Sequence, residues 1–144
     1  MPAMAGSNAL AVAPDILVRG TGAVGLAAAL ALARQGLRVA LLGPLDAPAA
    51  GAAAPGAPDI RAYALNAASV DLLKDVKVWE AIPDEARTQV HEMRIEGDDG
   101  ASVLEFSAWN SALAELAWIV DAAALDAVLR QAVRFAPHIE RVPA

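Results

Sequence analysis

The sequence predicts an α/β fold in which a parallel βαβ unit is followed by an antiparallel β-hairpin. An apolar strand, a glycine turn, an alanine-rich helix and a second apolar strand follow one another within about 30 residues near the N-terminus. A later segment alternates apolar and polar residues on both sides of a turn that contains glycine and aspartate. The chain has 144 residues and no internal repeat of fixed period, which favours one domain.

The first element is a strand over residues 15–19, followed by a helix over 23–35 that Gly36 ends and a second strand over 37–42. A helix with a regular apolar face is then predicted over 67–76. The remaining predicted elements are a hairpin over 90–106 with its turn at 97–100, a brief strand over 118–120, a helix over 122–135 that Asp121 caps and a strand over 138–142.

Two low-complexity stretches lie outside the predicted helices and strands. Residues 1–13 are small and weakly apolar, and they predict a flexible leader that lacks the basic start of a secretory signal. Residues 44–58 combine Pro, Gly and Ala and predict a flexible loop within the domain expected over 14–144. The longest uncharged run, 20–33, is shorter than the roughly 18 residues of a membrane span, so we expect no transmembrane segment.

Composition limits the classes of partner. The chain carries 11 Lys plus Arg against 17 Asp plus Glu, a formal net charge of -6. Nucleic acids and anionic membranes both require a basic surface, so this balance argues against them and favours small molecules or proteins. The absence of Cys excludes thiolate chemistry and disulfides, and 2 His leave little for a metal site, so no metal ligand is assigned.

Residues 20–25 read Gly-Thr-Gly-Ala-Val-Gly, a GxGxxG motif directly after a strand and at the start of a helix. Gly20 permits a sharp turn, Gly22 leaves room for a pyrophosphate near backbone N–H groups, and Gly25 lets the helix approach the strand. The helix N-terminus then directs free amides and the positive end of its dipole at the anion. This context predicts a Rossmann-like dinucleotide site formed by Gly20, Gly22, Ala23, Val24 and Gly25. The alternative is a glycine turn that serves only helix packing.

The ribose contact of such a site is left open. The motif usually has an acid about 20 residues on, at the end of the second strand, but Gly43 stands there. Asp46 either substitutes for that acid or is a solvated turn residue. Arg19, just before the first glycine, is either an exposed strand end or an additional phosphate contact.

Residues 59–69 read Asp-Ile-Arg-Ala-Tyr-Ala-Leu-Asn-Ala-Ala-Ser and are followed by Leu-Leu at 72–73 and Val-Trp at 78–79. Together with the glycine motif, they resemble the FAD-dependent aromatic hydroxylases of ubiquinone biosynthesis, a family of class A flavoprotein monooxygenases. In that family an Arg-x-x-Ala-Leu segment opens a helix and a Val-Trp segment follows it. The resemblance continues through Ala-Trp-Ile-Val-Asp at 117–121 and the next helix, and covers nearly everything after Pro14.

The resemblance implies that FAD is the cofactor, with the three motif glycines around its pyrophosphate and Arg61 beside the flavin or the pyrophosphate. A guanidinium can donate to such oxygens in a planar fork, whereas the alternative for Arg61 is a solvated residue at a helix entrance. It also implies NAD(P)H as the reductant, O2 as co-substrate and an aromatic quinone precursor as substrate. Because the cofactor supplies that chemistry, no catalytic residue is assigned.

Several positions depart from the family pattern. An acid is expected where Gly43 stands, a polar or basic residue near the flavin where Ala122 stands, and Gly where Lys77 stands. Family members are also much longer. The resemblance therefore implies the N-terminal portion of an FAD-binding domain with part of a substrate-domain hairpin, incomplete relative to the family fold and not catalytic alone. It implies a cytoplasmic location, or for the intact enzyme one peripheral to the inner membrane.

The remaining aromatic and histidine residues are expected to be structural. Trp79, Trp109 and Trp118 are expected to be core anchors or domain contacts rather than flavin-stacking residues. His91, in the alternating segment, and His138, after a helix-ending Pro, are expected to be structural or exposed.

Two alternatives to an FAD hydroxylase portion remain. A NAD(P)-binding Rossmann dehydrogenase domain shares the glycine turn but requires βαβ units in series instead of a Pro/Gly stretch and a hairpin. A non-enzymatic interaction module would pair with itself or with another polypeptide through exposed apolar surface.

Overall fold

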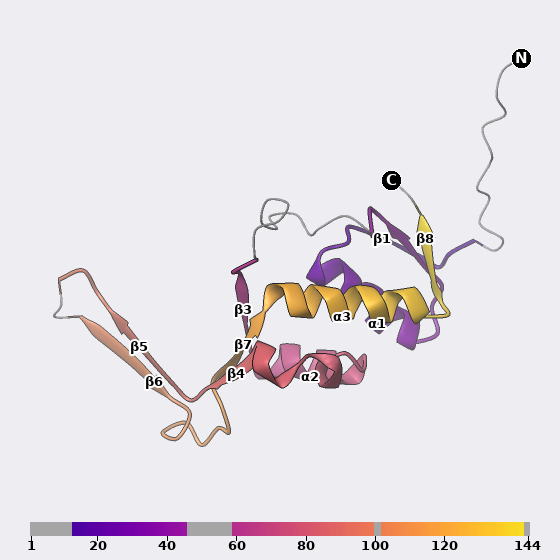
Figure 1. Ribbon diagram of the computed structural model, residues 1–144. Helices are drawn as coiled ribbons and strands as arrows, with labels where there is room; N and C mark the ends of the chain where they lie inside the picture. The colour runs from indigo at the N-terminus through magenta and orange to yellow at the C-terminus, as the bar shows by residue number, and fades with distance from the viewer. Residues whose placement is uncertain (1–12, 46–58, 100–101, 143–144) are drawn as a thin grey trace, which may run out of the picture.

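The computed structural model describes residues 13–45, 59–99 and 102–142. A body of helices and a parallel sheet adjoins a small antiparallel sheet, from which a long hairpin projects (Figure 1). Nearly all of the predicted leader and most of the predicted 44–58 loop lie outside the described residues.

The parallel sheet contains β1 (Ile16–Arg19), β2 (Val39–Leu42) and β8 (Ile139–Val142) in the order β1-β2-β8. Helix α1 (Ala23–Arg34) connects β1 to β2, so the predicted βαβ unit is present. The central strand β2 is almost fully buried, as its continuous apolar sequence favours. In β1, half-buried and exposed residues alternate instead, and Leu17 is 62% exposed.

Helix α3 (Ala122–Phe135) packs beside α1, and the two run side by side in Figure 1. Each buries one apolar stripe, and the alanines of both helices also favour the helical conformation. α2 (Ala67–Asp75) is capped by Asn66, whose side chain accepts a hydrogen bond from the Ser69 N–H at 2.9 Å. The core combines these stripes with β2; its largest fully buried side chains are Leu26, Leu41, Ile82, Leu129, Val39, Val78, Val120 and Val133.

An antiparallel sheet lies at one end of the helices, with β3 (Ala62–Leu65), β7 (Ala117–Asp121) and β4 (Arg87–Val90) in the order β3-β7-β4. Two short 3-10 turns, Trp79–Ala81 and Asp84–Ala86, lead from α2 to β4. The family pattern places residues 61–65 at the opening of a helix, but residues 62–65 form β3 and the helix begins only at Ala67. Pairing with β7, where Tyr63 faces Val120, determines that difference.

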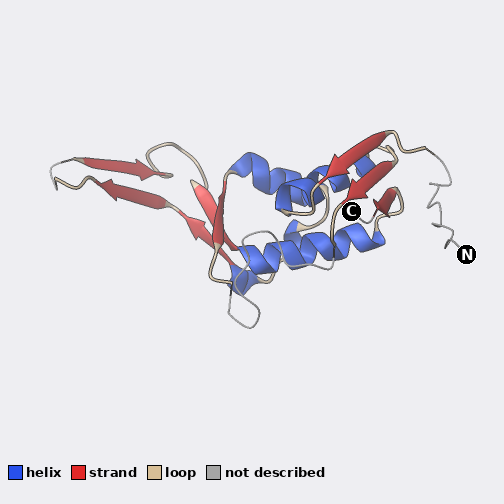
Figure 2. Cartoon of the chain, turned by 90° about the horizontal axis from the view of Figure 1, so that it is seen from above, coloured by secondary structure: helices blue, strands red, loops and turns tan. Residues whose placement is uncertain are grey.

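The projecting hairpin consists of β5 (Glu92–Glu96) and β6 (Val103–Ser107), paired antiparallel (Figure 2). The predicted alternation is therefore real, although Val90 belongs to β4 and His91 lies between two strands rather than within one. One face of the hairpin is charged, with Arg94 Nη1 3.1 Å from Glu105 Oε1. The opposite face is apolar and exposed, and consists of Met93, Ile95, Leu104 and Phe106.

The three tryptophans divide between core and surface. Trp79 is buried and meets Trp118 edge to face, with ring centroids 5.1 Å apart and planes at 82°. Arg87 lies over the Trp79 ring at 5.0 Å. Trp109 is 90% exposed and is not a core anchor. In the described part of the chain, no helix is both long enough and apolar enough to cross a bilayer.

Candidate functional site

The glycine turn follows β1 directly. Gly20 adopts φ +113°, in the left-handed region that favours glycine, and its N–H donates to the Leu42 carbonyl at 2.9 Å. The turn is thereby fixed to the end of β2 before α1 begins. The five predicted motif residues Gly20, Gly22, Ala23, Val24 and Gly25 all lie in this turn and the first turn of α1.

Gly25 makes the close approach of helix and strand possible. A Cβ at this position would lie 2.2 Å from the Gly20 carbonyl oxygen, which is well inside van der Waals contact. That oxygen belongs to the backbone, so no side chain can move aside. Any residue other than glycine would therefore force α1 away from the turn.

Gly22 has the opposite environment, because a Cβ there would meet no atom within 4 Å. It is the N-cap of α1 and offers no side-chain acceptor. The first intrahelical bond runs from the Leu26 N–H to the Gly22 carbonyl at 3.0 Å, so the amides of residues 23–25 precede the helical ladder. The turn is thus open in front of backbone donors at the positive end of a helix dipole, as an anion requires.

The other two α-helices in the described ranges have side-chain caps. Asn66 caps α2, and the Asp121 carboxylate accepts from the N–H groups of Ala123 and Ala124 at 2.8 and 3.1 Å to cap α3. A carboxylate in the same place on α1 would compete with a phosphate. The uncapped N-terminus of α1 therefore distinguishes the glycine turn from ordinary helix starts in this chain.

The end of β2 has Gly43 where many dinucleotide sites have an acidic residue that binds a ribose hydroxyl. Gly43 has φ +144°, and a Cβ there would lie 3.0 Å from the Thr21 Cγ2 methyl. The Thr21 side chain is buried and its Oγ1 donates to the Pro44 carbonyl at 2.9 Å. An acidic side chain at position 43 would thus need both strained backbone and movement of Thr21. Asp46 lies outside the described residues, and Arg19 is an exposed strand end.

Arg61 immediately precedes β3 and lies beside the start of α3, outside the glycine turn. Its carbonyl accepts from the Ala122 N–H at 3.0 Å, and its side chain is 34% exposed. The Nε and Nη2 groups donate to the two oxygens of Asp59 at 2.8 and 2.6 Å. These hydrogen bonds lower the pKa of Asp59 to about 2 and raise the pKa of Arg61 above its ordinary value. A phosphate bound by Arg61 would share it with Asp59.

Two residues that the sequence did not single out link Arg61 to the turn. Asp126, one turn into α3, is among the negative charges that raise the pKa of Arg61, and its Oδ2 accepts from Arg130 Nε at 2.5 Å. Arg130 Nη2 in turn donates to the Thr21 carbonyl at 3.1 Å. The sequence signal was an acid and an arginine four residues apart on a helix. Most such pairs lie on solvated faces, so that signal alone does not identify a site.

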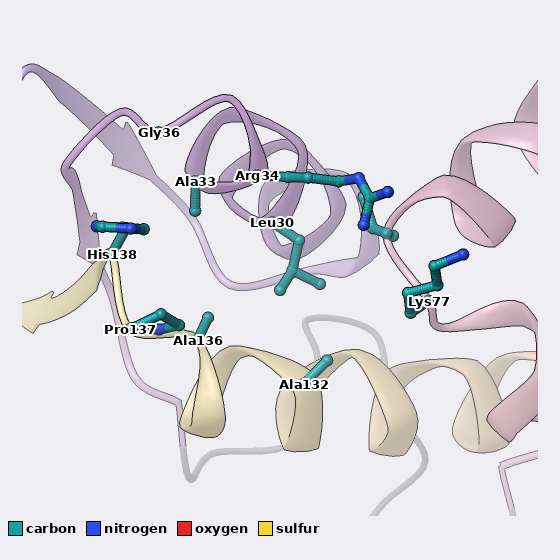
Figure 3. Close-up of a pocket in the computed structure, with 10 residues that line it drawn as sticks. Leu30, Ala33, Arg34, Gly36, Lys77, Ala132, Ala136, Pro137 and His138 are labelled. Carbon is teal, nitrogen blue, oxygen red and sulfur yellow. The ribbon is translucent and has the colours of Figure 1, made fainter.

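Two further depressions border α1. One, of about 310 Å³, adjoins the glycine turn and has an apolar lining that includes Ala23, Val24 and Tyr63. The other, of about 450 Å³, lies at the C-terminal ends of α1 and α3, where Arg34, Lys77 and His138 are found (Figure 3). Cations at helix C-termini complement the dipole, which accounts for the basic residues there without a ligand. His138 is exposed, as expected.

Comparison with known proteins gives consistent matches. Residues 14–134 match the family described as FAD binding domain. The chain is 34% identical over 130 residues to 3-demethoxyubiquinol 3-hydroxylase of Escherichia coli K12, covering 90% of this chain and 32% of that enzyme. It therefore spans about a third of the length of this curated relative.

Solved structures share the fold. PqsL of Pseudomonas aeruginosa has a TM-score of 0.65 at 19% identity, over 90% of this chain and 32% of that chain. The p-nitrophenol 4-monooxygenase PnpA of Pseudomonas putida DLL-E4 has a TM-score of 0.60 at 18% identity, over 89% and 31% of the two chains. An open, uncapped glycine turn on a βαβ unit suits a dinucleotide pyrophosphate, and the family match specifies which one. This chain belongs to the FAD binding domain family, and its cofactor is FAD.

Proposed function

We propose that this chain is the N-terminal FAD-binding portion of an NAD(P)H- and O2-using aromatic ring hydroxylase of the ubiquinone-biosynthesis type. The observation that carries the proposal is the contrast within one turn, where Gly25 is closed against Gly20 and Gly22 faces open space. Such a turn holds a helix N-terminus in place and leaves its donors accessible. The identity to a ubiquinol hydroxylase supports the reaction class.

In this proposal the amides of residues 23–25 bind the pyrophosphate of FAD, and Arg61 supplies a second positive contact to phosphate or flavin oxygens. Asp59 holds the Arg61 guanidinium in one orientation before the cofactor binds. Bound FAD supplies the electron and oxygen transfer, so the chain contributes binding and orientation and no acid, base or nucleophile. The ribose contact at the end of β2 is made without a carboxylate at position 43.

We propose that the chain alone does not turn over substrate. Hydroxylation by a flavin requires a reaction space from which water is excluded. The glycine turn holds the pyrophosphate end of the cofactor, and Val24 beside it is 85% exposed, so the turn does not supply that enclosed space. In this proposal the substrate of the whole enzyme is an aromatic quinone precursor. The enzyme is cytoplasmic or, when intact, peripheral to the inner membrane. The name of the Escherichia coli relative, 3-demethoxyubiquinol 3-hydroxylase, supports this substrate class.

Fluorescence titration of FAD tests the binding site. The wild-type chain should quench flavin fluorescence saturably. Gly22→Ala should weaken the affinity and Gly22→Val should abolish it, because added carbons enter the pyrophosphate space. Both variants should keep the wild-type circular dichroism and melting temperature, since the space at Gly22 is free.

The matched control is Ala127→Val, which adds carbons at an exposed position of α3 and should bind FAD as the wild type does. Equal FAD affinity for wild type and Gly22→Val would exclude the turn as the binding site. A folded wild-type chain that binds no FAD would exclude the proposed function for this chain.

A second candidate function is an interaction module, which the exposed apolar face of the β5–β6 hairpin favours. Two-stranded hairpins are marginal alone, and this one exposes Met93, Ile95, Leu104 and Phe106 together. We propose a second copy of the chain as the partner on that face. Light scattering at increasing concentration should then show dimers that Ile95→Lys abolishes and Arg94→Lys, on the charged face, preserves. A monomer at every concentration would exclude this candidate.

A further inference from the structure

We propose that Arg130, held by Asp126, is a positioning residue that joins the glycine turn to the segment after β2 and so sets the geometry in which FAD pyrophosphate is bound. This inference rests on the proposed FAD-binding function. It assigns a role to two residues of α3 that lie outside the glycine motif. No contact between Arg130 and the cofactor is required.

One guanidinium connects three backbone carbonyls from two segments. Nη2 donates to Thr21, between the first two motif glycines, at 3.1 Å. Nη1 donates to Leu45 and, at 3.5 Å, to Pro44, both just after β2. Nε donates to Asp126, which fixes the plane of the fork. The Arg130 and Asp126 side chains are only 12% and 19% exposed, and the contacts to Asp126, Leu45 and Thr21 are partly buried.

The turn needs such an external restraint. Glycine at positions 20 and 22 gives the backbone around Thr21 unusual conformational freedom. The N-terminus of α1 also lacks a side-chain cap, which leaves its first turn without a local restraint of that kind. Thr21 is instead held from outside the turn, through its Oγ1 to Pro44 and its carbonyl to Arg130. Ordering the turn before the ligand arrives lowers the entropic cost of binding.

The charge arrangement supports a geometric role over a purely stabilising one. Asp126 Oδ1 is buried and has no hydrogen-bond partner among the described residues. A buried ion pair with an unsatisfied oxygen contributes little net stability relative to apolar packing. Asp126 also acts electrostatically on Arg61, the other candidate cofactor contact. The Asp126–Arg130 pair on α3 therefore acts on both the glycine turn and Arg61.

The test compares Arg130→Met with Arg130→Lys, and uses Arg134→Met, an exposed arginine on the same helix, as the matched control. Amide hydrogen exchange of the full chain without ligand is the first measurement. Arg130→Met should accelerate exchange of the Gly20 and Gly43 amides, which donate to the Leu42 and Val142 carbonyls, by about tenfold or more, as expected when a hydrogen bond to a charged group is removed. Exchange in the buried parts of α1 and α3 should stay unchanged, and Arg134→Met should match the wild type.

FAD titration is the second measurement. Arg130→Met should bind FAD about tenfold or more weakly, and Arg130→Lys should recover only part of the loss, because one ammonium cannot reproduce a fork across three carbonyls. Unchanged exchange at the turn in Arg130→Met would overturn the inference. Full recovery by Arg130→Lys, or faster exchange with unchanged FAD affinity, would also overturn it. If Arg130→Met does not fold, Arg130→Lys and Asp126→Asn are compared in the same way.

The two proposals fail separately. A wild-type chain that binds no FAD would contradict the proposed function and, with it, the cofactor role of Arg130. The hydrogen-exchange measurement needs no ligand, so it still decides whether Arg130 orders the turn. Normal FAD binding with no effect of Arg130→Met on exchange or affinity would contradict the inference alone.

Discussion

Gly22 and Gly25 belong to the same motif but serve different physical purposes. At Gly25 a side chain would collide with backbone, whereas at Gly22 it would enter free space. Gly25 is therefore a requirement of folding, and Gly22 is a requirement of the ligand under the proposed function. This difference allows folding and binding to be tested separately with single substitutions.

Gly25→Ala should lower the free energy of unfolding by about 1–3 kcal/mol or more, the usual range for overpacked sites. The cause is the Cβ placed 2.2 Å from the Gly20 carbonyl oxygen, which can be relieved only by moving α1. Urea denaturation followed by circular dichroism measures the loss. Gly22→Ala, which adds the same atom in open space, is the control and should lie close to wild type. Equal stability of the two variants would contradict the packing role of Gly25.

The Asp15–Arg38 pair should make stability depend on acid. Hydrogen bonds from the Arg38 side chain, together with its N–H, lower the pKa of Asp15 from 3.8 to about 2 in the folded chain. Its contribution is therefore present above the unfolded pKa and is lost as pH falls from about 4 toward 2. Asp15→Asn should reduce the fall of melting temperature across that window, and the remaining fall should include the contribution of Asp59, whose pKa is also lowered to about 2 by Arg61. Asp75→Asn, which removes an exposed charge at the end of α2, is the control, and an identical profile for both would refute the assignment.

At the scale of elements, the C-terminal cap of α2 explains why the family pattern has glycine where this chain has Lys77. Lys77 has φ +61°, the left-handed conformation that follows many helices. The Val78 N–H donates to the Leu73 carbonyl at 2.9 Å and completes the helix cap. The glycine that the family pattern leads one to expect here would adopt this conformation without strain, whereas the lysine of this chain is strained in it.

Lys77→Gly should therefore raise the free energy of unfolding by about 0.5–1 kcal/mol, the relief of left-handed strain less the added chain entropy of glycine. Lys77→Ala is the control, because it removes the same side-chain charge and retains the left-handed cost. Thermal and urea denaturation of both variants should place only Lys77→Gly above wild type. A gain of equal size in Lys77→Ala would show that charge, not backbone conformation, is responsible.

The elements found from sequence and those missed differ in where their hydrogen bonds come from. The ends of α1, α2 and α3 agree with the predicted ranges within two residues, because caps, glycines and apolar spacing are local signals. β3 and β4 were missed because both depend on pairing with β7, which is distant in sequence. β1 and β2 are equally short, but the local pattern around the glycine turn identifies them. For a short strand without such a local pattern, the partner decides the conformation, not the propensity.

At the scale of the whole molecule, FAD should stabilise the folded chain through the turn. A ligand that binds only the folded state adds about 2.7 kcal/mol at a concentration one hundred times its Kd. The melting temperature should therefore rise with FAD concentration. Riboflavin, which lacks the pyrophosphate, should give no shift at the same concentrations, and ADP, which contains it, should give one. A riboflavin shift equal to that of FAD would contradict recognition through the glycine turn.

The sequence by itself determined the βαβ unit, the hairpin, the glycine turn and the family, because each depends on residues close together in the chain. Only the tertiary structure showed that Gly22 is open and Gly25 closed, that Arg61 is paired with Asp59, and that Trp109 is exposed. It alone brought Arg130 to Thr21, 109 positions away. Burial and contacts between distant residues arise only when helices and strands pack, so local pattern determines the elements and packing determines which side chains meet.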